Sequence, residues 1–363
     1  MIGSFGLFGV IFVALGALLL AYSERIVEEV RRYDDAVGVG SAITIDIPVT
    51  EYMASPVFVY YELTNFYQNH RRYVKSRDDD QLAAGDSVQT GSSAYSTNCD
   101  PWVYSTYNST NMQLYPCGLV ARSVFNDTFT MSLKPKDSTE VLSVNLDQSS
   151  ATISWEQDVE KKFHQANPSV STSSNLPLLE AVDMWLLKTF PPQVCLPTSP
   201  GVIPAYVPVD TVSTESGMEV VDCDFSLDPP TCNFVNNACT GDLAPAANPA
   251  GWGIDNAHFI NWMRTAGLST FRKLYARIDQ SFYPGDVITV GLQSNFPVDS
   301  YEGTKSVVLS TVSWAGGKNS FLGVGYIVVG GLALVFTAVY TVLHLKHPRQ
   351  LIDIDYLDWG QSH

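Results

Sequence analysis

Basic side chains are scarce in this sequence. The 363 residues carry 21 Lys and Arg against 37 Asp and Glu, which gives a formal net charge of −16. Most of this acidic excess lies between Ser23 and Lys318. Because a strongly acidic surface repels phosphate groups, the composition argues against a nucleic-acid partner. A domain kept soluble in a lumen or outside the cell is the simplest explanation of such a charge.

The sequence also lacks the common motifs of catalytic and metal sites. It contains no C-x-x-C pair, no H-E-x-x-H motif and no G-x-S-x-G motif. The run Gly316-Gly-Lys-Asn-Ser320 resembles the end of a phosphate-binding loop, but Val312 stands where that loop has its first glycine. We therefore predict no catalytic residues, no cofactor and no metal site.

Charged side chains are absent from two long apolar runs. Met1–Tyr22 has none, and Phe321–Leu345 has only the titratable His344. A helix needs about 20 apolar residues to cross the hydrocarbon core of a membrane. The first run has neither the basic flank nor the small-residue cleavage site of a removable signal peptide. We predict transmembrane helices at residues 1–22 and 319–345, an outer domain at 23–318 and a tail at 346–363.

Six cysteines lie between the two apolar runs: Cys99, Cys117, Cys195, Cys223, Cys232 and Cys239. The glycosylation sequons Asn108-Ser-Thr110 and Asn126-Asp-Thr128 lie in the same segment. An even number of cysteines beside sequons is typical of an oxidising compartment. We therefore predict a lumenal or extracellular domain with glycans on Asn108 and Asn126, and both termini in the cytoplasm. The basic residues of the tail agree with this orientation.

Several segments of the outer domain have the pattern of β-strands. Apolar and polar residues alternate from Ser41 to Pro48, and Val57–Leu63 is rich in β-branched and aromatic residues. Similar segments follow at Val141–Leu146, Ala151–Trp155, Val287–Leu292 and Ser306–Ser313. Because these strands come from both ends of the domain, we predict an α+β membrane protein with an antiparallel β-sandwich-like outer domain.

Helical patterns interrupt the strands. We expect Ser23–Arg32 to extend the first membrane helix, and we expect further helices at Leu176–Phe190 and Asp255–Tyr275. The stretch at residues 169–250, by contrast, is dense in proline and small residues, which predicts an irregular, disulfide-pinned excursion. Its four cysteines allow three pairings. The local pairs Cys195–Cys223 and Cys232–Cys239 are the ones that we favour.

Basic residues do gather once, in His70-Arg-Arg-Tyr-Val-Lys-Ser-Arg77, and the acidic run Asp78-Asp-Asp80 follows directly. Such a cluster can bind lipid headgroups or an acidic loop of a partner protein. The neighbouring carboxylates can also neutralise it within the chain. From composition alone we favour this internal network of ion pairs.

The same region carries a family resemblance. The run from Tyr61 to Asp79, YELTNFYQNHRRYVKSRDD, resembles the signature of the cell division control protein 50 / ligand-effect modulator family. Further blocks that resemble the family follow in its order: Pro116–Leu119, Phe125–Phe129, Trp262–Ala266, Thr270–Tyr275, Leu309–Trp314, Gly316–Asn319 and Phe321–Gly323. Members of the family are non-catalytic β-subunits of type IV P-type ATPases, the phospholipid flippases.

The resemblance implies an accessory subunit that helps a flippase to fold, leave the endoplasmic reticulum and reach the Golgi, endosomes or plasma membrane. It also implies a disulfide between Cys99 and Cys117. The family signature further suggests which residues contact the ATPase: Asn65, Phe66, Tyr67, Asn69, His70, Arg71, Arg72, Tyr73, Arg77, Trp262, Arg264 and Trp314.

Two alternatives remain beside this expectation. The first is a receptor or adhesion domain that binds an extracellular ligand through its cysteine-rich excursion. The second is a subunit whose ATPase partner is fused to another enzyme. Membrane lipids are a further expected contact of any chain with two transmembrane helices.

Overall fold

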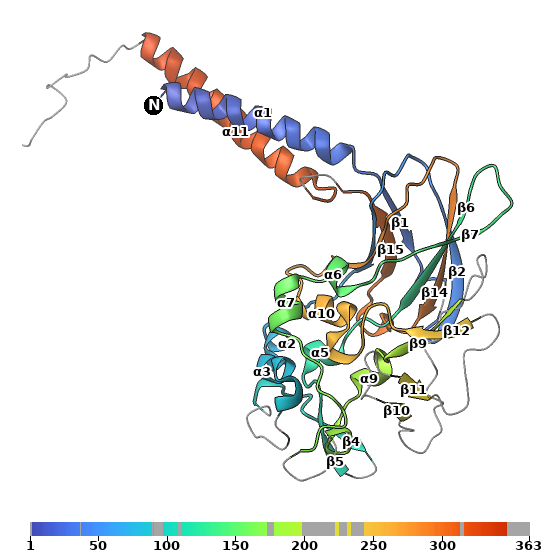
Figure 1. Ribbon diagram of the computed structural model, residues 1–363. Helices are drawn as coiled ribbons and strands as arrows, with labels where there is room; N and C mark the ends of the chain where they lie inside the picture. The colour runs from blue at the N-terminus through green and yellow to red at the C-terminus, as the bar shows by residue number, and fades with distance from the viewer. Residues whose placement is uncertain are drawn as a thin grey trace, which may run out of the picture. The chain divides into compact units, whose positions relative to one another are not determined.

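The computed structural model describes residues 2–36, 38–88, 90, 97–107, 110–172, 178–197, 222–224, 231–233, 243–312 and 316–346. The chain divides into two compact units (Figure 1). The first consists of Met1–Val27 and Val312–His363, and the second of Glu28–Thr311.

The first unit contains two long apolar helices, α1 (Ile2–Glu24) and α11 (Ser320–Lys346), which lie side by side in Figure 1. With 23 and 27 residues, both are long enough to cross a membrane. Glycines in both helices allow the two backbones to approach each other closely. A Cβ added at Gly9 would lie 3.0 Å from the carbonyl oxygen of Gly330, and one at Gly16 would lie 2.7 Å from that of Gly323. The helices therefore run antiparallel, with glycines facing each other at two levels.

Two four-stranded antiparallel sheets form the centre of the second unit. The first sheet has the order β1 (Glu28–Arg32), β15 (Lys305–Ser310), β3 (Val57–Leu63) and β13 (Phe271–Ile278). The second has the order β2 (Ser41–Pro48), β14 (Val287–Ser294), β6 (Thr128–Lys134) and β7 (Leu142–Val144).

Aromatic side chains pack the two sheets against each other. The ring of Phe129 in β6 lies 4.7 Å from that of Tyr275 in β13 and 5.9 Å from that of Tyr33, which follows β1. All three side chains are buried. Burying one aromatic side chain of this kind contributes about 1.5–3 kcal/mol, so the contact between the sheets is a main source of stability.

Short elements surround the two sheets (Figure 1). The helices are α2 (Arg71–Lys75), α3 (Asp79–Ala83), α5 (Leu119–Arg122), α6 (Ser150–Ile153), α7 (Glu156–Lys161), α8 (Leu178–Ala181), α9 (Leu186–Thr189), α10 (Ala257–Met263) and the 3₁₀-helices η1 (Gly85–Ser87), η2 (Gly253–Asp255) and η3 (Asp299–Tyr301). The small sheets are β4 (Tyr104–Tyr107), β5 (Thr110–Leu114) and β8 (Val182–Asp183); β9 (Gln193–Pro197) with β12 (Leu243–Ala247); and β10 (Asp222–Asp224) with β11 (Thr231–Asn233).

The fold class predicted from the sequence is confirmed, and the strands predicted at Ser41–Pro48 and Val57–Leu63 have the observed bounds. The predicted helical extension Ser23–Arg32 is wrong. The helix ends at Glu24, and β1 then pairs with β15 through backbone contacts such as Val30 opposite Val308. Only the arrival of β15 from the other end of the domain makes this strand possible.

Three other predicted elements are corrected. The strand at Ala151–Trp155 is helical, because Ser149 and Thr152 hydrogen-bond to the carboxylate of Asp147 and stabilise a helical turn. The helix at Leu176–Phe190 breaks into α8 and α9, because β8 between them pairs with β5.

The helix predicted at Asp255–Tyr275 ends at Met263, and its second half is strand β13. Asn256, not Asp255, caps α10, since its side chain accepts hydrogen bonds from the backbone N–H groups of His258 and Phe259. The apolar residues of this segment follow the spacing of one long helix. In the structure, however, some of them are buried in α10 and the others in β13.

Candidate partner-binding surface

The signature segment is anchored by the side chain of Phe66. Its ring lies 5.3–6.3 Å from five other aromatic rings: Tyr73, Trp262, Phe271, Phe296 and Tyr301. Trp262 is fully buried and donates its indole N–H to the carbonyl of Val120 over 2.8 Å. Trp262 is therefore part of the hydrophobic core of the second unit, and Phe66 packs half-buried against it. Both residues are among the predicted partner contacts.

Polar side chains of the signature hold its loop against the loop after α10. Gln68 accepts a hydrogen bond from the backbone N–H of Ala266, and Asn69 donates to the carbonyl of Gly267, each over 2.8 Å. Asn65 has a positive φ of 58°, a conformation that asparagine tolerates well, and it donates to the carbonyl of Tyr301. These contacts fix the backbone of the segment from Asn65 to Asn69.

Tyr73 is the inward-facing residue of α2. Its hydroxyl lies 2.7 Å from that of Ser123, and burial raises the pKa of Tyr73 to about 12. The hydroxyl therefore stays protonated and acts as a hydrogen-bonding group that ties α2 to the end of α5. It is not free for a partner.

The block Pro116–Leu119 packs directly against the end of α2. Gly118 has φ +100°, and a Cβ there would lie 2.2 Å from the carbonyl oxygen of Ser76. Only glycine accommodates both conditions. Beside it, Cys99 and Cys117 form the disulfide that the resemblance implies, with their Cα atoms 5.6 Å apart. The Pro116–Leu119 block and the segment around Cys99, joined by this disulfide, thus form one rigid support for the end of α2.

Two arginines of the predicted contact set have partners within the chain. Arg77 donates to the carbonyl of Met263 over 2.9 Å and pairs with Asp79 at 3.0 Å. Arg264 pairs with Asp158, and its guanidinium lies 5.2 Å from the centre of the Trp155 ring. The hydrogen bonds from Arg264 and Lys162 lower the pKa of Asp158 against the opposing effect of its burial.

The other basic residues of the cluster face solvent. His70, Arg71, Arg72 and Lys75 are exposed, and none of them forms an ion pair with any residue that the structure describes. The carboxylate of Asp78 instead caps α3 by accepting from the backbone N–H of Gln81. The predicted internal network is therefore wrong for these four residues, because the acidic run turns away into its own helix.

Apolar side chains border this basic surface. Tyr67 and Val74 are 57% and 37% exposed, and Leu268, in the loop bound by Asn69, is 73% exposed. We define the basic face as Tyr67, His70, Arg71, Arg72, Val74, Lys75 and Leu268. The cluster His70–Arg77 noted in the sequence already contains Val74 and Lys75, whereas sequence reasoning missed Leu268. Leu268 is apolar and follows Gly267 within a segment that the sequence predicts as helical. Its neighbours in the sequence therefore do not indicate that its side chain is exposed.

Some predicted site residues lie outside the described part of the chain, namely Trp314, Asn108 and Cys239. Asn126 is half-buried, and Phe125 and Phe129, which flank the sequon in the sequence, are buried. Within the described residues, no group of three or more His, Cys, Asp or Glu is placed to hold a metal ion.

Two packed apolar helices, with a disulfide-bonded antiparallel β domain between them in the sequence, define an integral membrane protein with two spans. Residues 22–350 match the model of the LEM3 (ligand-effect modulator 3) family / CDC50 family. The chain belongs to this family, whose accessory subunits are non-catalytic.

Curated relatives from plants and animals support the assignment. The chain is 32% identical to ALA-interacting subunit 3 of Arabidopsis thaliana, across 99% of this chain and 84% of the relative. It is 33% identical to putative ALA-interacting subunit 4 of the same plant, across 98% and 86%. It is also 33% identical to human cell cycle control protein 50B, across 83% and 70%.

Proposed function

We propose that this protein is the accessory β-subunit of a type IV P-type ATPase that moves phospholipids across a membrane. Membership of the LEM3/CDC50 family carries the proposal. The name of the Arabidopsis relatives describes subunits that interact with ALA proteins, which supports an ATPase as the partner. ATP hydrolysis belongs to that partner, and this chain stabilises its fold and conformations.

The basic face is the surface that we assign to the outer loops of the ATPase. It combines exposed cations with exposed apolar side chains on a backbone fixed by Phe66 and by the Cys99–Cys117 support. On a chain of net charge −16 this cluster is the exception, so it favours an acidic partner segment. A subunit shifts the conformational equilibrium of its partner only by contacting one conformation better than another.

The proposed topology places the outer domain in the lumen or outside the cell, with both termini in the cytoplasm. Glycans on Asn108 and Asn126 and disulfides in the outer domain follow from this placement. The path that we propose runs from the endoplasmic reticulum to the Golgi, endosomes or plasma membrane. Removal of N-glycans by a glycosidase should increase gel mobility by about two glycan units.

Co-purification with the ATPase tests the proposal directly. We expect the full chain, extracted in mild detergent, to bring down a large multi-span ATPase. The triple variant Arg71→Glu, Arg72→Glu and Lys75→Glu should lower the yield of this complex at least tenfold. The matched control is Arg31→Glu, Lys134→Glu and Lys161→Glu, which reverses three exposed cations outside the basic face.

The control variant should retain the complex. Equal loss in both triple variants would show that net charge, rather than the basic face, governs assembly. If a stable surface protein without any ATPase is recovered, the receptor alternative replaces the accessory-subunit proposal.

A further inference from the structure

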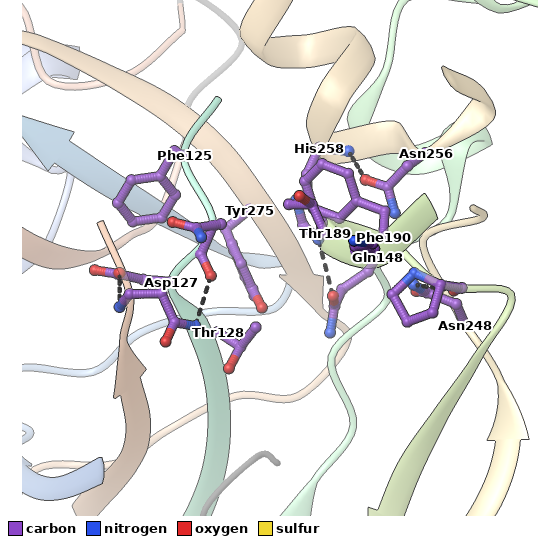
Figure 2. Close-up of a pocket in the computed structure, with 14 residues that line it drawn as sticks. Phe125, Asp127, Thr128, Gln148, Thr189, Phe190, Asn248, Asn256, His258 and Tyr275 are labelled. Carbon is purple, nitrogen blue, oxygen red and sulfur yellow. Dashed lines mark hydrogen bonds between the residues drawn. The ribbon is translucent and has the colours of Figure 1, made fainter. Parts of the chain in front are cut away.

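A cavity of about 250 Å³ lies where the end of the excursion meets the two sheets. Figure 2 shows side chains that line it, which come from widely separated parts of the chain. Thr128 begins β6, Thr189 ends α9, His258 lies in α10, and Gln148 precedes α6. A volume slightly below that of drug-sized sites suits a ligand about as large as one sugar unit or a little larger.

Asn126, the acceptor of the second sequon, is itself part of the cavity wall. Its backbone carbonyl accepts a hydrogen bond from Asn295 over 3.1 Å, which fixes its position. Its side-chain amide, in contrast, makes no hydrogen bond to any residue that the structure describes, so the nitrogen is free for a glycosidic bond. The Oγ1 of Thr128 likewise has no partner among the described residues.

The wall combines amide groups with aromatic rings. Gln148 and Asn248 supply amides, and Phe190 supplies an aromatic ring (Figure 2). The amide of Asn256 is already bound by α10 and by Gly251, and the ring of Tyr275 stacks on that of His258 at 4.4 Å, so these two residues shape the wall. Amides hydrogen-bond to hydroxyl and acetamido groups, and ring faces pack on the apolar faces of sugar rings. This composition is suited to a saccharide.

The electrostatics of the cavity favour a neutral ligand. The carboxylate of Asp127 is already bound by Lys305 at 2.7 Å and by Tyr33 at 2.6 Å. Burial lowers the pKa of His258 to about 3, so its ring is neutral. The exposed Lys188 at the rim is the remaining charged group among the lining residues. One cation is a weak basis for binding a phosphate or a carboxylate ligand.

We propose that this cavity seats the protein-proximal N-acetylglucosamine of the glycan attached to Asn126. The inference rests on the proposed glycosylation of Asn126 and deepens it: the glycan is a structural part of the outer domain. The sugar packs between the base of the excursion and β6, with the remainder of the glycan in solvent.

Native deglycosylation of the full chain, produced with its ATPase in a eukaryotic host, tests the inference. The glycosidase must reach the bond between Asn126 and the first sugar. We therefore expect the Asn126 glycan to be removed at least tenfold more slowly than the Asn108 glycan from the native protein. After denaturation both should be removed at the same rate, as measured by mass spectrometry of the glycopeptides.

Thr189→Trp fills the cavity without removing a hydrogen bond among the described residues, and should expose the Asn126 glycan to rapid native cleavage. Thr270→Trp, at an exposed position outside the cavity, is the control and should preserve the protection. An unmodified Asn126 would overturn both the glycosylation and this inference. A modified Asn126 that is cleaved as fast as Asn108, or that stays protected in Thr189→Trp, would overturn the cavity assignment alone.

Discussion

At the level of single residues, Asp127 links three distant parts of the second unit. Its side chain accepts hydrogen bonds from Tyr33 after β1, from Lys305 in β15 and from the backbone N–H groups of Asn295 and Phe296. The side chains of Lys305 and Asp127 are 2% and 0% exposed. Burial, and then the negative charge of Asp127, raise the pKa of Tyr33, so its hydroxyl remains a donor. The middle residue of a glycosylation sequon is thus also a buried structural anion.

Removing one partner of this buried pair should be costly. We expect Lys305→Met to destabilise the outer domain by about 3–5 kcal/mol, because it leaves the Asp127 carboxylate buried without its cation. The double variant with Asp127→Asn should recover part of this loss and keeps the sequon intact. Chemical unfolding of the full chain in detergent measures both effects.

A surface ion pair provides the comparison. Arg277 and Asp279 lie 2.7 Å apart with side chains 40% and 60% exposed, so Arg277→Met should change stability by about 1 kcal/mol or less. If Lys305→Met costs no more than Arg277→Met, the buried pair is not a main support of the fold.

His258 predicts a dependence of stability on acid. Burial lowers its pKa to about 3 from an ordinary value near 6.5. The unfolded chain therefore binds a proton that the folded chain does not, and stability falls as the pH drops below about 6.5. The pKa values of the Asp147 and Asp158 carboxyl groups are lowered from an ordinary value of 3.8, so both groups stay ionised between pH 7 and pH 5.

Melting temperatures at pH 7 and pH 5 check this expectation. The unmodified chain should melt at a clearly lower temperature at pH 5, and His258→Gln should reduce this difference. An unchanged difference in the variant would assign the acid sensitivity to another group.

At the level of elements, the structure separates two kinds of membrane glycine. Gly9, Gly16, Gly323 and Gly330 lie where α1 and α11 touch. Added Cβ atoms at Gly325 and Gly331 would meet no atom within 4 Å. Small residues in membrane helices permit close approach of another backbone, so Gly325 and Gly331, like Gly3 of α1, are open to a helix of the partner.

Substitution of two adjacent glycines tests this separation. Gly330→Leu should disrupt the helix pair, because a Cβ there lies 2.8 Å from the backbone nitrogen of Val13. Gly331→Leu should leave the isolated chain intact and lower only the yield of the ATPase complex. Size-exclusion chromatography of the chain alone and of the complex distinguishes the two effects. Equal loss of the isolated chain in both variants would contradict the observed packing.

The backbone register of β10 and β11 bears on the cysteine pairing. Cys223 and Cys232 are directly opposite each other in this antiparallel pair. Opposite residues of such strands have Cα atoms about 4.5–5.5 Å apart, which suits a disulfide. We therefore now expect Cys223–Cys232, with Cys195 and Cys239 as the second pair, in place of the local pairs. Peptide mapping without reduction decides between them: a peptide that links Cys195 to Cys223 would restore the earlier prediction.

At the level of the whole molecule, charge and topology indicate a protein that acts through contact. The acidic second unit carries the basic face, which is unpaired among its described residues, and the first unit supplies two helices. Two helices cannot enclose a hydrophilic path for a lipid headgroup, because polar groups within the bilayer need partners. Transport therefore requires the helices of another subunit.

The purified chain alone should show neither ATP hydrolysis nor lipid scrambling in reconstituted vesicles. Co-expression with its ATPase should produce ATP-dependent lipid transport, and a catalytically inactive ATPase variant in the same complex is the control. ATP hydrolysis by the isolated chain, at a rate changed by substitutions within it, would contradict the accessory role.

The sequence by itself determined the features that depend on neighbouring residues. Membrane helices need only a continuous apolar run, and strands such as Val57–Leu63 need only alternation and β-branched side chains. Tertiary contacts decided the rest. Residues 271–275 became a strand because β3 pairs with them. Trp262 became a core residue, with Phe66 half-buried against it, because aromatic rings from distant parts of the sequence meet there. Arg71 and Arg72 stayed unpaired among the described residues because Asp78 turns inward to cap α3.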